Sequence, residues 1–261
     1  MHTKQTTVQT VLDWLNQIAP FDTQEEFDNA GFQVGRLGTP VSNILLTLDV
    51  TEEVIKEAAE LKCELIISHH PLIFSPLTNL DLSKHVPRLI SLLIKHQISL
   101  IAVHTNIDQS PDYSASVAVA RQLQLKKLRN TDDPYLFLGE LSDPMKPDAL
   151  ARLIGDTLDV PIRQYGEHEG LVHTLAIAGG AYSEGFLGAQ QAGAQALLTG
   201  EVKHHHALEA AATSFIIYDG GHYATEVTML APLAFGLQTA LNQVEYPVRV
   251  HVTRCRSYHL R

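Results

Sequence analysis

The fold class of this chain is decided by one stretch of sequence, Leu65-Ile66-Ile67-Ser68-His69-His70-Pro71-Leu72-Ile73-Phe74. It opens with a short apolar run that ends at a polar break, which is typical of a buried parallel strand at its carboxyl end. In open α/β sheets, ligands bind at that end of the strands. Neighbouring side chains in extended backbone point to opposite sides, so His69 and His70 cannot easily chelate one ion. They suit two adjacent ions, which indicates a dinuclear metal site, and metal pairs usually perform hydrolytic or redox chemistry.

The segments around this strand alternate between strand and helix patterns. Apolar residues recur at helical spacing from Val8 to Ile18, which predicts an amphipathic helix. Further along the chain, short apolar runs alternate with helical segments, and this alternation indicates right-handed βαβ units with largely parallel sheets. We expect strands at 44–48, 65–67, 98–103, 135–141, 174–178, 196–199, 215–218 and 248–252. We expect helices at 8–18, 52–61, 84–96, 113–123, 148–158, 183–192, 203–212 and 224–241. The periodicity lapses at 126–134, where we place a boundary between two lobes.

Composition restricts the class of protein. The 261 residues are 45% apolar and 18% charged, an ordinary balance for a globular chain. The net charge of −10 argues against a nucleic-acid protein held by its overall charge, because phosphate binding depends on basic side chains. The two cysteines, Cys63 and Cys255, form no disulfide framework. No apolar run approaches the length of about 18 residues typical of a membrane span, so we expect a cytoplasmic protein without a membrane partner.

Further metal-ligand candidates follow two other predicted strands. The strand at 98–103 runs into His104 and Asp108, and the strand at 215–218 runs into Asp219-Gly220-Gly221-His222. His222 and Glu226 are four residues apart at the start of a helix, so they share one face. A histidine at one strand end is most often a loop residue, but three such sites together favour a metal centre. The candidate ligands are His69, His70, Asp108, His222 and Glu226.

This mixed set of nitrogen and oxygen ligands suits zinc, iron, manganese, cobalt or nickel better than calcium or magnesium. We expect His104 to support Asp108 by hydrogen bonding, with direct ligation as the alternative. Glu201 and His205 follow a fourth strand and are candidates for proton relay or substrate contact. The alternative for that segment is an exposed polar first turn of a helix. We interpret Asp28-Asn29 as a turn, with a role in shaping the cleft as the alternative.

Taken together, these motifs resemble those of a known family. The family is that of the NGG-interacting-factor-three-like proteins, also called the YbgI or GTP cyclohydrolase I type 2 family. The resemblance covers nearly the whole chain and depends on five motifs in this order: Asp28-Asn29-x-Gly31-x-Gln33-Val34-Gly35, Ser68-His69-His70-Pro71-Leu72, His104-Thr105-x-x-Asp108, Thr199-Gly200-Glu201-x-Lys203-x-His205 and Gly221-His222-x-x-x-Glu226. Many relatives carry Asp at the positions of Glu201 and His206.

The resemblance implies an α/β fold with two three-layer α/β lobes and a dinuclear metal site in the cleft between them. It implies the compact form of the family, without the domain that some longer relatives insert between the lobes. Residues 1–127 are expected to form the first lobe, with 222–261 packing back onto it, and 128–221 the second. It also implies a toroidal homohexamer, a trimer of dimers. The metal ligands carried over are the five candidates given above.

Our leading hypothesis is a metal-dependent hydrolase with two divalent transition-metal ions per chain. Metal-activated water would attack a small-molecule substrate that is nucleotide-like, a cyclic amide or a phosphoester. By resemblance, this hydrolase is described as GTP cyclohydrolase 1 type 2-like. The alternative is a metal-binding chaperone, storage or regulatory scaffold without turnover. A nucleic-acid or transcription partner is disfavoured by the acidic charge.

Overall fold

The structure is a computed structural model that describes residues 5–242 and 248–257. The chain divides into two compact units: unit 1 comprises Met1–Ser110 and Leu230–Arg261, and unit 2 comprises Pro111–Met229. The predicted divisions lie elsewhere, at 127/128 and 221/222. Helix α5 (Ala115–Gln122) belongs to unit 2 because it packs on that unit's strands β6 and β8 and on its helix α9.

Unit 1 contains a five-stranded sheet built around the stretch that decides the fold. Its strand order is β1-β4-β3-β2-β11. Strand β1 is antiparallel to β4 and the other pairs are parallel, as expected. Ser68, at the end of β3, pairs with Thr47 on one side and Ala102 on the other, so three carboxyl ends meet at one edge. The bounds are β1 Gly31–Val34, β2 Asn43–Thr47, β3 Leu65–Ser68, β4 Ser99–Ala102 and β11 Arg249–Val252.

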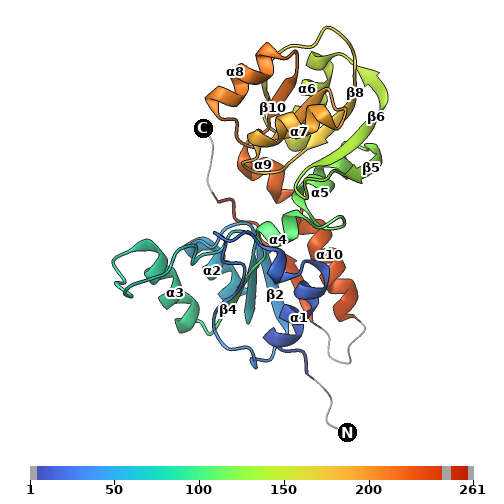
Figure 1. Cartoon of the computed structure of the whole chain (residues 1–261). Helices are drawn as coiled ribbons and strands as arrows, with labels where there is room; N and C mark the ends of the chain where they lie inside the picture. The colour runs from blue at the N-terminus through green and yellow to red at the C-terminus, as the bar shows by residue number, and fades with distance from the viewer. Residues whose placement is uncertain (1–4, 243–247, 258–261) are drawn as a thin grey trace. The chain divides into compact units, whose positions relative to one another are not determined.

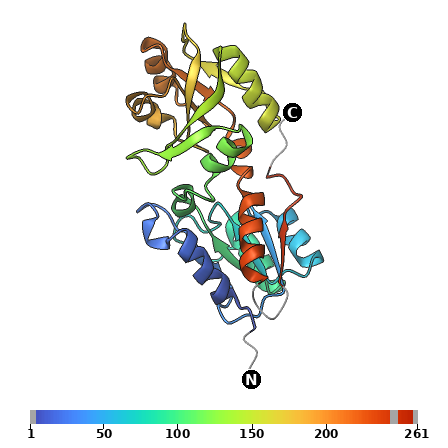
Figure 2. The same ribbon diagram turned by 90° about the vertical axis from the view of Figure 1, so that its right-hand side faces the viewer.

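Helices cover both faces of this sheet. Leu45, Ile66 and Leu100 pack against apolar residues of α2 and α3. Ile44 and Ile67 alternate with them, are fully buried, and point to the opposite face. In Figure 1, α3 lies on one side of these strands and α1 and α10 on the other, and Figure 2 shows α1 and α10 side by side. The helices are α1 Val8–Ile18, η1 Phe21–Thr23, α2 Glu52–Glu60, α3 His85–Lys95, α4 Thr105–Asp108 and α10 Leu230–Leu241.

Unit 2 contains a six-stranded mixed sheet. Its strand order is β5-β6-β8-β9-β10-β7, and only β8, β9 and β10 run parallel to one another. The expectation of largely parallel sheets therefore holds only for the centre of this unit, because β5, β6 and β7 pair antiparallel. The bounds are β5 Lys126–Asn130, β6 Phe137–Met145, β7 Arg163–Tyr165, β8 Val172–Ile177, β9 Ala196–Thr199 and β10 Ile216–Asp219.

Two apolar clusters cover the opposite faces of the second sheet. One joins Leu175 and Leu198 to α5 and α6, and the other joins Ala176 and Leu197 to α7 and α8. These strand residues alternate along β8 and β9, as expected when both faces are buried. The helices are α5, α6 Pro147–Leu158, η2 Ser183–Gly185, α7 Phe186–Gln191, α8 His204–Ala212 and α9 His222–Val227. Within the described residues, no helix is both long enough and apolar enough to span a membrane.

Two sequence-based expectations are corrected by these elements. The polar stretch interpreted as a lobe boundary contains β5, whose side chains are mostly exposed at the sheet edge and therefore show no apolar alternation. The single helix expected at 224–241 is two helices, α9 and α10. Pro232 lies in the first turn of α10, where a missing N–H breaks no helical hydrogen bond, so this proline was the available signal for a new helix start.

Candidate functional site

Three imidazoles gather at the carboxyl edge of the unit 1 sheet. His69 and His70 follow β3, and His104 follows the neighbouring strand β4. One ligand atom from each of the three residues lies within 4.8 Å of the others, so together they can hold a metal ion. The expectation that His69 and His70 cannot easily serve one ion is therefore corrected, because both lie in a bend after β3 and not in extended backbone. The ring centroids of His69 and His70 are 4.8 Å apart, and that of His104 is 5.2 and 5.5 Å from them. Adjacent strands in register explain why the sequence brings these residues together.

Each of these imidazoles has its Nδ1 against an oxygen. The partners are the Val103 carbonyl for His69, the Asp49 carboxylate for His70 and the Asp28 carboxylate for His104, each at 2.8 Å. An acceptor at Nδ1 assigns the ring proton to that nitrogen and leaves the Nε2 lone pair for a metal. Partners of this kind orient histidine ligands in metal sites. The sequence patterns did not single out Asp49. It nevertheless follows the carboxyl end of β2, where ligands are expected in an open α/β sheet.

Asp28 is more than a turn residue. Its side chain is fully buried, and it accepts hydrogen bonds from the Thr105 backbone N–H at 3.0 Å and the Thr105 hydroxyl at 2.5 Å. Burial disfavours the carboxylate, but hydrogen bonds from His104 and Thr105 outweigh it and lower the pKa of Asp28 to about 2. His104 was expected to support Asp108, and the structure places its Nδ1 against Asp28 instead.

Asp108 ends the short helix α4 and lies beside the imidazole group. Its Oδ1 is 3.8 Å from Nε2 of His69, and its side chain is 26% exposed. Three of the predicted ligands, His69, His70 and Asp108, therefore lie at the same end of unit 1. The carboxylate adds an oxygen donor to the nitrogen donors there.

Unit 2 carries the other two predicted ligands, one helical turn apart in α9. Nε2 of His222 lies 3.1 Å from Oε1 of Glu226, whose side chain is only 6% exposed. Nδ1 of His222 lies 2.7 Å from Oε1 of Glu201. Both imidazole nitrogens of His222 thus face carboxylate oxygens, and Nδ1 of His70 and of His104 does so in unit 1.

Glycines allow α9 to begin close to two strand ends. Gly221 precedes His222 with φ of +79°, a conformation that side chains disfavour. A Cβ on Gly180 would clash with the carboxylate of Glu226, and one on Gly200 would come within 2.7 Å of the His222 Cα. The loop after β8 and the end of β9 are therefore packed directly against the two ligands.

The two candidate relay residues differ in placement. Glu201 contacts His222, as described, and is exposed. His205 is also exposed, and its ring packs on His206 at 4.1 Å between centroids. His206 in turn has its Nδ1 2.9 Å from the Ser183 hydroxyl. Their proposed catalytic roles remain predictions.

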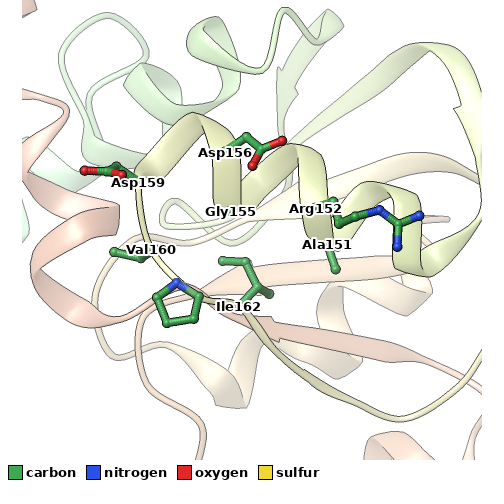
Figure 3. Close-up of a pocket in the computed structure, with 8 residues that line it drawn as sticks. Ala151, Arg152, Gly155, Asp156, Asp159, Val160 and Ile162 are labelled. Carbon is green, nitrogen blue, oxygen red and sulfur yellow. The ribbon is translucent and has the colours of Figure 1, made fainter.

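Two surface pockets differ in their relation to these residues. A pocket of 380 Å³ in unit 1 is lined by His70, Asp49, Thr51 and His85, among others. A pocket of 610 Å³ in unit 2, drawn in Figure 3, is lined by the end of α6 and by Val160 and Ile162. The second contains none of the predicted ligands, so its chemistry is separate from the candidate site.

Comparison with known proteins places this geometry in a family. A family model described as Duf34/NIF3 (NGG1p interacting factor 3) matches residues 6–257. The chain belongs to this family. Similar to this NIF3-family chain is the "GTP cyclohydrolase 1 type 2 homolog" of Streptomyces coelicolor, 31% identical over 94% of this chain and 90% of that protein. A protein of the same name from Clostridium perfringens is 32% identical over 91% and 94% of the two chains.

A solved structure carries the same fold. The crystal structure of Staphylococcus aureus hypothetical protein SA1388 matches this NIF3-family chain with a TM-score of 0.91 and 26% identity, over 99% of both chains. The family expected from the sequence motifs is therefore confirmed.

Proposed function

We propose that this chain binds two divalent transition-metal ions through His69, His70 and Asp108 of unit 1 and His222 and Glu226 of unit 2, and that it is a metal-dependent hydrolase. Zinc, iron, manganese, cobalt and nickel fit this donor set. Bound in pairs, such ions supply an activated water and a polarised electrophile. The substrate would be nucleotide-like, a cyclic amide or a phosphoester, in line with the names of the curated relatives.

The observation that supports this proposal is the state of the imidazoles. His69 and His70 each have an oxygen acceptor at Nδ1, which leaves Nε2 for a metal, and His222 lies between the carboxylates of Glu201 and Glu226. A histidine serving only as a surface polar group needs no such orientation. The acceptors come from the chain itself, so the protein supplies the groups that orient these rings.

Metal content of the untagged protein tests the binding half of the proposal. Elemental analysis after dialysis should give about two transition-metal ions per chain. His70→Ala and His222→Ala should each lower that ratio, because each removes a donor. The matched controls are His96→Ala in unit 1 and His173→Ala in unit 2, both exposed histidines, which should keep the wild-type content. Equal content in all five proteins would contradict the proposal.

Turnover tests the enzymatic half. The metal-loaded protein should hydrolyse at least one member of a panel containing GTP, a cyclic amide and a phosphodiester. Glu201→Ala should lower kcat with metal content unchanged if Glu201 relays protons. His205→Ala should do the same, and His204→Ala provides the exposed neighbour as a control. No turnover of the whole panel by protein with full metal content would leave only the binding half.

One observation favours the alternative, a metal-binding chaperone, storage or regulatory scaffold. Glu201 lies against Nδ1 of His222, a position suited to orienting that ring, and His205 packs on His206. A scaffold has no turnover to lose, so Glu201→Ala and His205→Ala would keep the metal content and change nothing else that is measured. The same two variants therefore separate the two functions.

The assembly and location expected for the family are also part of the proposal. We expect a toroidal homohexamer, a trimer of dimers, in the cytoplasm. Light scattering coupled to gel filtration should give about six times the chain mass of 28.8 kDa. A monomeric mass at micromolar concentration would remove the hexamer from the proposal.

A further inference from the structure

Two exposed aromatic rings stand beside the imidazole group of unit 1. Phe27 is 63% exposed and Phe74 48% exposed. Their ring centroids are 6.4 Å apart with planes tilted by 45°. The ring of Phe74 also meets His104 edge-on, with centroids 6.3 Å apart. Large exposed apolar side chains that lie together mark interaction sites, and this pair directly adjoins candidate metal ligands.

Hydrogen bonds from Asn29 and Gln33, two residues outside the candidate metal site, hold this pair in place. The backbone N–H of Ile73 donates to Gln33 Oε1 at 2.9 Å, and the Ile73 carbonyl accepts from Asn29 Nδ2 at 2.5 Å. Gln33 in turn donates to the Asn29 carbonyl at 2.7 Å. Both backbone polar groups of the residue before Phe74 are thus bound to the segment that follows Phe27. The rings remain exposed although the chain around them is fixed.

We propose that Phe27 and Phe74 form a stacking platform for a flat heteroaromatic ring, such as a nucleobase, in the substrate. This inference depends on the proposed function and selects the nucleotide-like class among its substrates. A ring stacked on one phenyl face would lie at 45° to the plane of the other. The ring would then lie next to His104, within reach of the candidate ligands.

Binding of matched probes tests the platform without requiring turnover. The probes are GMP, AMP and ribose 5-phosphate, which share the sugar phosphate and differ in the base. Calorimetry on the metal-loaded protein should show tighter binding of both nucleotides than of ribose 5-phosphate. Phe27→Ala and Phe74→Ala should each weaken nucleotide binding by about tenfold, leaving ribose 5-phosphate binding and metal content unchanged. Phe74→Trp should retain nucleotide binding, and so should the control Phe235→Ala, which removes the exposed phenylalanine of α10.

Three outcomes would overturn the platform. The first is no preference of the wild type for nucleotides over ribose 5-phosphate, and the second is unchanged nucleotide affinity in both alanine variants. The third is an altered oligomeric state with nucleotide affinity kept, which would make the pair a contact between copies of the chain. If the protein holds no metal but still binds nucleotides through these rings, the proposed function is contradicted. The stacking platform is then still supported.

Discussion

At the residue scale, the buried carboxylate of Asp28 links stability to pH. Its folded pKa of about 2 lies below the ordinary value of 3.8, so the unfolded state binds the proton more tightly. Its stabilisation is therefore complete above about pH 4 and is lost as the pH falls toward 2. Asp28→Asn should cost about 2 kcal/mol at neutral pH and reduce the loss of stability between pH 4 and 2.

The single tryptophan makes this measurable in unit 1 alone. Trp14 lies in α1, so urea unfolding followed by its fluorescence reports the unit that contains Asp28. Protein treated with chelator removes any contribution from bound metal. The control Asp22→Asn removes an exposed carboxylate on the same segment. Its free energy of unfolding should change between the two pH values by the same amount as that of the wild type. An acid dependence in Asp28→Asn equal to that of the wild type would contradict the assignment.

At the element scale, the start of α9 depends on a close approach that glycine permits. Gly180 and Gly193 both have positive φ, at +68° and +92°, but only a Cβ on Gly180 meets a neighbour, the Glu226 carboxylate. Gly193→Ala should show backbone strain alone, and Gly180→Ala should cost about 1–3 kcal/mol more, because the buried carboxylate of Glu226 must move. Calorimetric unfolding of the two variants checks the difference. Equal losses would mean that Glu226 yields without cost.

The same scale shows what the sequence could predict. Helix α1 is predicted with its observed bounds, since one apolar stripe identifies it. The edge strands β5 and β7 are missed because most of their residues are polar and carry no apolar alternation. The ligand candidates could be predicted because ligands bind at the carboxyl ends of parallel strands, and those ends can be located in the sequence. The contact between Asp28 and His104 joins loops 76 residues apart, and no local pattern records it.

At the scale of the whole molecule, the two units differ in how their residues are distributed along the chain. Unit 2 is one continuous segment with its own apolar clusters on both sheet faces. Unit 1 requires α10 and β11, which follow unit 2 in the chain. We therefore expect the fragment 111–229 to fold alone and melt cooperatively, as followed by circular dichroism. Fragment 1–229 should lose the native fluorescence of Trp14, because β2 loses its partner β11.

A shortened chain that lacks unit 2 provides the control for that pair of fragments. Connecting residue 110 to residue 230 by a short flexible linker restores every strand of the first sheet and should restore the native Trp14 emission. Native emission from fragment 1–229 itself would show that β2 tolerates an open edge.

Because unit 1 is formed by two separate segments of the chain, it cannot be completed until the last segment has been synthesised. While a ribosome is still making the middle of the chain, the emerged first segment has an unfilled place beside β2 and an apolar surface still lacking its last helix. Nascent chains in that condition are prone to aggregation and are clients of chaperones. Translational pausing inside unit 2 should therefore be more damaging to yield than pausing after β11.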